Sequence, residues 1–450
     1  MLSPSLALRA RLRAKRQEDS TKKERTMHDN EQKNTYGFSH TRSKLSFGRM
    51  VEMAAEMGME NPLFRCHERA AKATTSIDGR EYINFSTYDY LDINTHEAIT
   101  KAVTETAKVF GTSAGASRLV GGERPPHRIL EKSIADFYDV EDCIAYVSGH
   151  ATNVSTLGFL FGKKDAIFHD GLAHNSLLQG AKLSGAQRFS YAHNDCDALE
   201  KILTEKRDEF KHAVIVTEGL FSMDGNIPDL PRIIELKKRY NCMLLVDEAH
   251  SLGILGATGH GIREYYNIDP SDVDMWMSTL SKTLCGCGGF IAGKRELIEF
   301  LKYGSPGFVY SVGIPPVIAA ACSTALDIMQ KETWRVKKIQ DISQYFLSYA
   351  KSKGLDTGSA QGYAVIPVII GNSWVTGFLS QQLFKRGIYV MPISFPAVKE
   401  GTARLRFFLS AAHTEEQIRT TLDAVVEELP KATQLVREYK NSNPKAFTDI

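Results

Sequence analysis

Short apolar segments alternate with longer amphipathic ones through the middle of the chain, and this alternation limits the possible folds more than any other feature. Stretches with helical spacing separate most of the apolar segments. Near-continuous apolar strands separated by helices are what a mostly parallel sheet covered on both faces requires. We therefore predict an α/β fold with a mostly parallel central sheet. The predicted strands are CIAYV (143–147), AIFH (166–169), RFSYA (188–192), AVIVTE (213–218), CMLLVD (242–247), MWMST (275–279) and GFIAG (289–293).

A second mixed segment follows and predicts a smaller C-terminal α/β domain. It contains the apolar segments YAVIPVII and RLRFFLS and two helical patterns, at about residues 375–385 and 414–428. A chain of 450 residues is long enough for more than one domain. The expected division is a disordered basic extension (1–45), an N-terminal segment (46–105), a large domain (106–335) and a small domain (336–450).

Charge and cysteine usage indicate a soluble, cytoplasmic protein that acts on small molecules. The chain has 55 Lys and Arg against 53 Asp and Glu, so neither a nucleic acid nor an anionic membrane is expected as the main partner. Its seven cysteines are scattered and odd in number, which is typical of reduced thiols. Cys285 and Cys287 lack the second ligand pair of a zinc site, and no metal is expected. The longest charge-free run, residues 143–162, is too polar for a transmembrane helix.

The first residues have a composition of their own. The segment MLSPSLALRARLRAKRQ is basic and contains no acidic residue, as in a transit peptide, so residues 1–20 could direct the protein to mitochondria. A disordered tail, or a true start at Met27, are the alternatives.

The residues that end the predicted strands carry the chemistry. Ligands of open α/β sheets bind beyond the carboxyl ends of the strands, so these residues are expected to meet. They are the loop at 148–153, Asp170, His174, the segment 221–225, Asp247, His250, Ser278, Thr279 and Lys282.

Each of these groups suits one part of a phosphorylated aromatic ligand, although each also has an ordinary structural reading. The small residues at 148–153 could cap a helix, or present backbone N–H groups to a phosphate. A buried Asp247 needs a cationic or donor partner, and a protonated ring nitrogen would be one. His250 could donate to a ring oxygen and His174 could stack on the ring, but either could also be a plain core or surface histidine.

Lys282 decides between these readings. A lysine among apolar and small residues loses solvation, its pKa falls, and the amine becomes a nucleophile or base near neutral pH. A phosphate acceptor, an aspartate for a pyridinium, a stacking ring and such a lysine together specify pyridoxal phosphate held as a Schiff base.

Over residues 60–430 the chain resembles the α-oxoamine synthases, which are fold-type I pyridoxal-phosphate-dependent transferases. The family includes 8-amino-7-oxononanoate synthase, 5-aminolevulinate synthase, serine palmitoyltransferase and 2-amino-3-ketobutyrate CoA ligase. The motifs are INFSTYDYL (83–91), GTSAGASR (111–118), SGHATN (148–153), HDGLAHNSL (169–177), TEGLFSMDG (217–225), VDEAHSLGILGATGHG (246–261), STLSK (278–282) and RLRFFLSAAHT (404–414).

The resemblance implies how the cofactor is held. Lys282 would be the Schiff-base lysine and catalytic base, Asp247 the partner of the pyridine nitrogen and His174 the stacking ring. Ser222 and His250 would lie near the ring oxygen, and His250 or His174 could polarise the developing oxyanion.

Further residues are implied for the phosphate and the amino acid. Thr279 and the backbone at His150 and Ala151 would hold the phosphate, together with Ser311. Arg406 would bind the amino-acid carboxylate, because a guanidinium grips a carboxylate through two parallel hydrogen bonds. Arg404, on the same face of the same predicted strand, is the rival.

The chain departs from the family pattern in three segments. Tyr88 replaces an Asn expected near the acyl thioester, and His150 replaces the usual aromatic residue of its loop. Val312 and Gly313 stand where hydroxyl residues often reach the phosphate of the partner subunit, so that Ser311 would serve alone.

Two residues bear on the substrates. Ser117 occupies a position near the substrate side chain where glycine-specific 5-aminolevulinate synthases carry Thr, so we expect L-alanine or L-serine to be preferred over glycine; the alternative is that Ser117 only caps a turn. Arg65, also expected to bind substrate, lies in ENPLFRCHE (60–68), which resembles members that use a longer acyl group or a carrier protein.

The resemblance implies a decarboxylative Claisen condensation of the amino acid with an acyl thioester, carried by coenzyme A or an acyl carrier protein, to give an α-amino ketone. A homodimer with shared active sites is expected. The alternatives are a synthase whose product keeps its carboxylate, as in the ketobutyrate ligase, an aminotransferase on the same fold, and a catalytically silent partner subunit.

Overall fold

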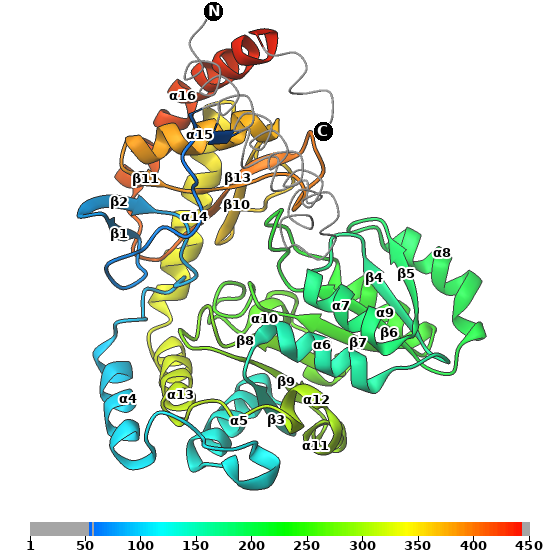
Figure 1. Ribbon diagram of the computed structural model, residues 1–450. Helices are drawn as coiled ribbons and strands as arrows, with labels where there is room; N and C mark the ends of the chain where they lie inside the picture. Colours follow the sequence, from blue (N-terminus) through cyan, green and yellow to red (C-terminus); the bar gives the residue numbers. More distant parts are fainter. Residues whose placement is uncertain (1–53, 56–57, 443–450) are drawn as a thin grey trace, which may run out of the picture. The chain divides into compact units, whose positions relative to one another are not determined.

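A seven-stranded sheet forms the centre of the structure, a computed structural model that describes residues 54–55 and 58–442 (Figure 1). Four strand pairs are parallel, while β9 runs antiparallel to both of its neighbours, β8 and β3. All seven predicted strands are present, each within one residue of its expected ends, and the predicted α/β class is confirmed. In spatial order the strands are β3 (Asp142–Tyr146), β9 (Gly289–Gly293), β8 (Met275–Thr279), β7 (Met243–Asp247), β6 (Ala213–Glu218), β4 (Ala166–Asp170) and β5 (Gln187–Tyr191).

Burial along the strands explains why they read as apolar runs. Every residue of β4, β6, β8 and β9 is buried, as expected for strands covered on both faces. β5 lies at one edge, where its Gln187, Arg188 and Ser190 are exposed. Polar residues on an edge strand reduce pairing with other chains.

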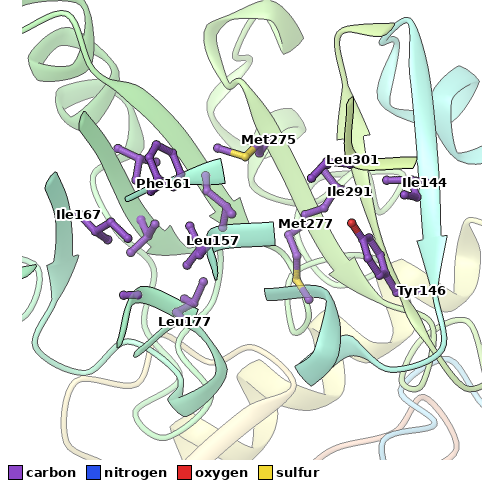
Figure 2. Packing of buried hydrophobic residues seen from close by; sticks show 14 of the residues in the cluster. Ile144, Tyr146, Leu157, Phe161, Ile167, Leu177, Met275, Met277, Ile291 and Leu301 are labelled. Carbon is purple, nitrogen blue, oxygen red and sulfur yellow. The ribbon is translucent and has the colours of Figure 1, made fainter. Parts of the chain in front are cut away.

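Side chains alternate between two layers of helices. Figure 2 shows Met275 and Met277 of β8 in a buried cluster with Leu157 and Leu177, which come from α6 (Gly149–Leu160) and α7 (Asn175–Ser184). Trp276, between the two methionines, contacts Tyr138 of α5 (Pro125–Tyr138), with ring centroids 5.7 Å apart. This alternation follows from the two-residue period of a strand, and it leaves the strand ends free to carry polar groups.

The remaining helices connect and flank these strands. They are α8 (Cys196–Lys206), α9 (Leu230–Arg239), α10 (Gly261–Tyr266), α11 (Arg295–Gly304), α12 (Pro306–Val309) and, outside the central sheet region, α4 (Glu97–Phe110), α13 (Pro316–Lys331) and α14 (Trp334–Ser352).

Two three-stranded sheets lie outside the central one. One contains β1 (Thr74–Ile77), β2 (Arg80–Asn84) and β11 (Ile388–Tyr389), and the other contains β10 (Val365–Gly371), β13 (Ala403–Phe408) and β12 (Met391–Ile393). In the chain, helix α15 (Ser373–Lys385) follows β10 and helix α16 (Glu415–Ser442) follows β13.

The last helix is longer than the sequence indicated. We expected it to end at about residue 428, but α16 continues through Pro430 to Ser442. Proline removes one hydrogen bond of the helix, yet Ala432 and Val436 beyond it are buried and keep the apolar face in contact with the protein.

Residues 62–436 form one compact unit. The expected domain boundaries at 105 and 335 stay predictions, and the extension at 1–45 with its targeting or start-site alternatives lies outside the described residues. All seven cysteines lie in the described part and are free thiols. None of the helices that the structure describes is both long and apolar enough to cross a bilayer.

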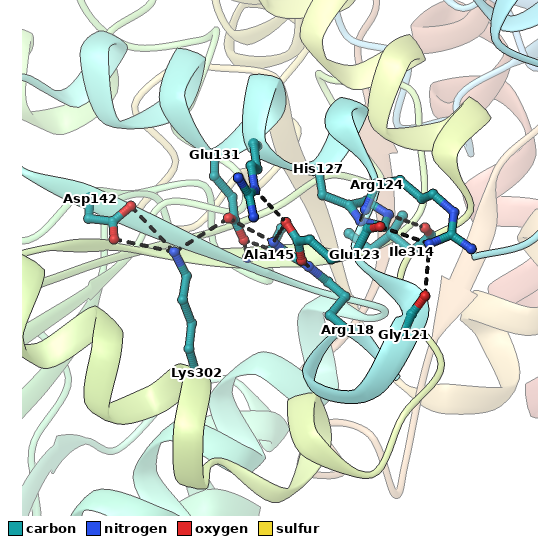
Figure 3. Close-up of polar contacts among 11 residues, drawn as sticks. Arg118, Gly121, Glu123, Arg124, His127, Glu131, Asp142, Ala145, Lys302 and Ile314 are labelled. Carbon is teal, nitrogen blue, oxygen red and sulfur yellow. Dashed lines mark hydrogen bonds and ion pairs between the residues drawn. The ribbon is translucent and has the colours of Figure 1, made fainter. Parts of the chain in front are cut away.

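A buried ion-pair network holds the segment around Arg118 against the sheet (Figure 3). The Arg118 guanidinium donates to both carboxylate oxygens of Glu131, at 2.5 and 2.9 Å, and to Glu123. Glu131 also accepts from the backbone N–H of Ala145 in β3, at 2.8 Å, and lies 3.5 Å from Lys302. The side chains of Arg118 and Glu131 are only 4% and 5% exposed, so neither charge can be compensated by water.

We expect Glu131→Gln to lower the free energy of unfolding by about 3 kcal/mol, because it leaves the buried Arg118 without its main counter-charge. Arg128→Gln is the control, since this arginine also contacts Glu123 but its side chain is 78% exposed, and its loss should change stability by less than about 0.5 kcal/mol. Urea denaturation of the two variants measures the difference. Equal midpoints would show that the network contributes no stability.

Candidate active site

A cavity of about 250 Å³ lies where the carboxyl ends of the parallel strands meet. Glu218, Asp247 and Thr279, the last residues of β6, β7 and β8, all line it. Seven of the residues that the sequence assigned to the site come together here: Tyr88, His150, His174, Asp247, His250, Thr279 and Lys282. The other lining residues are Ser148, Gly149, Asn153, Ser176, Glu218, Ala249, Met277 and Ser281.

Lys282 lies on the loop between β8 and β9. Desolvation lowers the pKa of its amine to about 8, and the charge of Arg406 acts in the same direction, while Asp247 and Glu218 oppose it. A large fraction of the amine is therefore deprotonated, and can act as a nucleophile, at a pH only slightly above neutral. Its Nζ is 5.6 Å from the centre of the Tyr88 ring.

Two glycines let this loop fold close to the N-terminus of α6. A Cβ on Gly289 would lie 2.6 Å from the Cα of Gly149, and a Cβ on Gly149 would lie 2.8 Å from Oγ1 of Thr279. Neither contact is possible for a larger residue without movement of the backbone or of Thr279. Gly149 and Gly289 thus bring Thr279 and the first turn of α6 to the same side of the cavity.

The Asp247 carboxylate is buried and partly satisfied. It accepts a hydrogen bond from Nδ2 of Asn153 at 2.8 Å and one from the backbone N–H of Ala249 at 3.0 Å. An ionised carboxylate can accept about four hydrogen bonds, so capacity remains for a further donor. A protonated pyridine nitrogen is a donor of the required charge, and the site fits pyridoxal phosphate in this respect.

Glu218 is the neighbour of Asp247 across the β6–β7 pair. Burial, and then the nearby charge of Asp247, raise the pKa of Glu218 well above its ordinary value. Its Oε1 accepts the backbone N–H of His174 at 2.7 Å. Two adjacent buried carboxyl groups cannot both be ionised cheaply, and Glu218 is the protonated one.

The environments of His174 and His250 both favour the neutral ring. Burial, with the positive charges of Lys282 and Arg406, lowers the pKa of His250 well below its ordinary value, and its Nδ1 is 2.7 Å from the Tyr90 hydroxyl. Desolvation is also the main cause that lowers the pKa of His174. His174 begins α7 as its N-cap and stays accessible, as a residue that stacks on a flat ligand must be.

Of the residues expected to bind a phosphate, only some line the cavity. Thr279 lines the cavity, but its hydroxyl donates to the carbonyl of Gly288 at 2.9 Å. The N–H of Ala151 donates to the Ser148 hydroxyl at 3.4 Å, and Ala151 does not line the cavity. Gly149 and His150 do line it, at the start of a twelve-residue helix.

The structure separates the two candidate arginines. Arg404 forms an ion pair with Asp224 at 2.7 Å and donates to the carbonyl of Met223, so its guanidinium is occupied. Arg406 lies outside the lining of the cavity, where one nitrogen donates to the carbonyl of Ser222 at 3.2 Å. Its buried Nε has no hydrogen-bond partner among the described residues. Arg406 thus has a buried donor without a partner among the described residues, whereas Nε and Nη1 of Arg404 are both bonded.

The other assigned residues lie away from the cavity of their own chain. The Ser117 hydroxyl donates to the carbonyl of Val309 at 2.7 Å, and the Arg65 guanidinium lies 3.4 Å from the centre of the Phe384 ring. Ser222 and Ser311 do not line the cavity either. Ser117 and Ser311 belong to segments that are bonded together, because the N–H of Gly313 also donates to the carbonyl of Ala116.

Three buried polar residues of the cavity were given no role of their own by the sequence analysis, namely Asn153, Ser176 and Glu218. All three lie inside quoted motifs, and Glu218 ends a strand whose other residues are nearly all apolar. A polar side chain at the end of a buried strand was the available signal for Glu218.

Comparison with known proteins agrees with this geometry. A family model described as aminotransferase class I and II matches residues 80–425. The 8-amino-7-oxononanoate synthase of Thermoanaerobacter pseudethanolicus is 36% identical over 348 residues, which are 77% of this chain and 88% of that protein. The 4-hydroxy-2,2'-bipyrrole-5-methanol synthase PigH of a Serratia species is 35% identical over 80% of this chain but 55% of its own length.

Solved structures give the same grouping. Serine palmitoyltransferase of Sphingomonas wittichii superposes with a TM-score of 0.81 and 27% identity, covering 86% of this chain and 97% of that one. The 8-amino-7-oxononanoate synthase of Francisella tularensis has a TM-score of 0.69 and 26% identity, covering 78% and 98%. The chain belongs to the aminotransferase class I and II family and, within it, to the α-oxoamine synthases, which are pyridoxal-phosphate-dependent acyltransferases.

Proposed function

We propose that the protein condenses a small L-amino acid with an acyl thioester, with loss of CO2, to give an α-amino ketone. The observation that carries the proposal is the placement of a lysine with a pKa of about 8 and a buried aspartate in one cavity of about 250 Å³. A lysine with this pKa has a substantial neutral fraction near physiological pH and can bind an aldehyde, and the aspartate can keep a pyridine nitrogen protonated.

Each group of the cavity then has a task toward pyridoxal phosphate, which when bound supplies an electron sink for a carbanion at the amino-acid Cα. Lys282 holds the cofactor and, when released, takes the Cα proton and later returns one. Asp247 stabilises the proton on the ring nitrogen. His174 stacks on the ring, and His250 can donate to a ring oxygen or to the oxygen that becomes negative during acyl transfer.

We infer that Arg406 binds the amino-acid carboxylate. Its guanidinium has an unpartnered buried Nε, and it is close enough to lower the pKa values of both Lys282 and His250. A carboxylate would satisfy that donor and neutralise the charge. Arg404, whose Nε and Nη1 are paired with Asp224 and backbone carbonyls, is better explained as structural.

We also infer a homodimer in which Ser117 and Ser311 serve the partner's site. Neither residue lines the cavity of its own chain. The neighbours of Ser311 expose apolar side chains, Tyr310 at 86% and Val312 at 53%, which a partner would cover. Ser117 would then lie near the side chain of an amino acid bound in the other subunit.

The acyl thioester is delivered by coenzyme A or an acyl carrier protein in this proposal. Tyr88 supports a site for the acyl group next to the cofactor, because its half-exposed ring packs against Phe408 and lines the cavity. Arg65 is proposed as a further contact for this substrate. The cytoplasm is the proposed location.

Lys282→Ala should abolish the visible absorbance of bound cofactor and lower turnover by at least about 10³, because nucleophile and base are lost together. Lys282→Arg, which keeps the positive charge but not the nucleophile, should give the same loss. In the native protein, the rate of cofactor attachment should rise with pH through about 8, since the amine reacts only when deprotonated. Borohydride reduction followed by peptide mapping identifies the lysine, and a label on another lysine contradicts the assignment.

Arg406→Ala should raise the KM for the amino acid about tenfold or more while cofactor absorbance is retained, because a charged hydrogen bond to the substrate is lost. Arg404→Ala should instead lower thermal stability with little change in KM, since its partners are protein groups. Steady-state kinetics and thermal unfolding of both variants separate the two roles. An equal rise in KM for both would remove the distinction.

The native enzyme should use L-alanine or L-serine in preference to glycine. Ser117 leaves more space than a threonine would, and one methyl group typically changes selectivity by about 1–3 kcal/mol. The test is a matrix of amino acids against acyl thioesters, with the products identified by mass spectrometry. A product that retains the carboxylate, or no condensation at all, would contradict the proposed reaction.

Ser117→Thr is the matched variant for this specificity. The added methyl group should lower kcat/KM for alanine relative to glycine by about tenfold. An unchanged ratio would show that Ser117 does not face the substrate and only bonds to Val309.

A further inference from the structure

We propose that Asn153 and Ser176 form a hydrogen-bonded link that joins Asp247 to His174 and positions both residues for the cofactor. The link is made entirely of groups of this chain, and only its purpose rests on the proposed function. Neither Asn153 nor Ser176 is assigned a part in the reaction above.

The contacts form a continuous series across three elements. Nδ2 of Asn153, on α6, is 2.8 Å from Oδ2 of Asp247 at the end of β7 and 2.9 Å from Oγ of Ser176 on α7. Oγ of Ser176 is 2.7 Å from Nδ1 of His174. Asn153 and Ser176 are each only 1% exposed, so water does not compete for these bonds.

Close packing of α6 and α7 makes the link possible. A Cβ on Gly180 of α7 would lie 2.6 Å from the backbone oxygen of Asn153. Glycine at this position allows the two helices to approach, and the Asn153 side chain then reaches the first turn of α7.

The charge of Asp247 sets the direction of every proton in the series. The Asn153 amide must turn its nitrogen toward the carboxylate, because its oxygen would be repelled. Its two hydrogens are then used, one on Asp247 and one on Ser176. The backbone N–H of Ser176 donates to Nδ1 of His174 at 3.3 Å, so Nδ1 is an acceptor. The Ser176 hydroxyl, which accepts from Asn153, then donates its single hydrogen to Nδ1 at 2.7 Å. The His174 ring therefore carries its proton on Nε2.

This orientation is kept although it leaves Oδ1 of Asn153 buried and without a hydrogen-bond partner in the described part of the chain. An unpaired buried carbonyl is unfavourable. A purely structural asparagine would be expected to satisfy both ends of its amide.

The link keeps the Asp247 carboxylate and the His174 imidazole apart, so that the two groups do not compete for one proton. Asp247 favours the charged form of His174, whereas desolvation first, and then Lys282, His150 and Arg406, lower its pKa. A hydroxyl donor on Nδ1 stabilises the neutral ring further. Asp247 can thus remain ionised for the cofactor nitrogen while His174 stays a neutral, fixed stacking surface. The backbone of His174 is held separately, by Glu218.

The test uses cofactor-free protein with labelled histidines, in which NMR follows the protonation of the His174 ring with pH. Ser176→Val and Ser176→Thr form a matched pair, since the two side chains have nearly the same shape and only threonine keeps the hydroxyl. The proton affinity of His174 should increase about three- to tenfold in Ser176→Val and return toward the native value in Ser176→Thr. Ser176→Ala also removes the hydroxyl but adds no atoms. It should therefore shift the titration in the same direction as Ser176→Val, even if the methyl groups of valine disturb the packing.

Asn153→Leu should raise the proton affinity of His174 as well, because the Ser176 hydroxyl is then no longer held in place. Combining it with Ser176→Val should add little, since both changes break one series. Ser184→Ala, which removes a hydroxyl at the other end of α7, is the control and should leave the titration unchanged.

A native His174 ring with its proton on Nδ1, or equal titrations in the valine, threonine and alanine variants, would overturn the link. These measurements need neither cofactor nor turnover. If instead the titrations shift as expected but the protein never binds pyridoxal phosphate at Lys282, the link stands and the proposed function fails.

Discussion

A carboxylate can be buried only where donors surround it, and at the ends of β6 and β7 the chain buries two side by side. Burial and the neighbouring Asp247 raise the pKa of Glu218, which favours its protonated form, while the Asp247 carboxylate accepts hydrogen bonds from Asn153 and a backbone N–H. The other charged groups of the cavity are arranged around these two carboxyl groups. Lys282 lies near them with a lowered pKa, and the site as a whole is prepared for a ligand that brings a proton on a ring nitrogen.

Rigid elements supply most of this arrangement. The aspartate ends a strand buried in the centre of the sheet, and Asn153 and Ser176 lie on two helices that pack on one face of it. Positions fixed by the packing of a sheet vary less than positions on loops, which favours a reaction that depends on the angle between a ring and a side chain. Arg406 comes from a separate small sheet, so the proposed substrate contact belongs to a different element from the proposed cofactor contacts.

The sequence predicted the central sheet closely because buried parallel strands are continuous apolar runs, and the residues that end them had to converge. It did not predict the length of α16, since a proline normally ends a helix and only the burial of Val436 explains its continuation. Asn153 and Ser176 escaped notice because their importance depends on how closely α6 and α7 approach. The choice of Arg406 over Arg404 required the ion pair with Asp224, which no spacing along one strand reveals.

The antiparallel direction of β9 has a consequence for Lys282. Because β8 and β9 are bonded to each other, the loop that carries the lysine is fastened at both ends, and Leu280 and Gly286 are bonded across it. The amine can leave a reaction partner and yet move no farther than its own side chain allows. It therefore returns at an effective concentration far above that of any dissolved amine, on the order of 10⁵ M or more in well-oriented systems. The antiparallel pairing of β9 with β8 thus keeps the Lys282 amine close to the site, where it could act more than once in a single turnover.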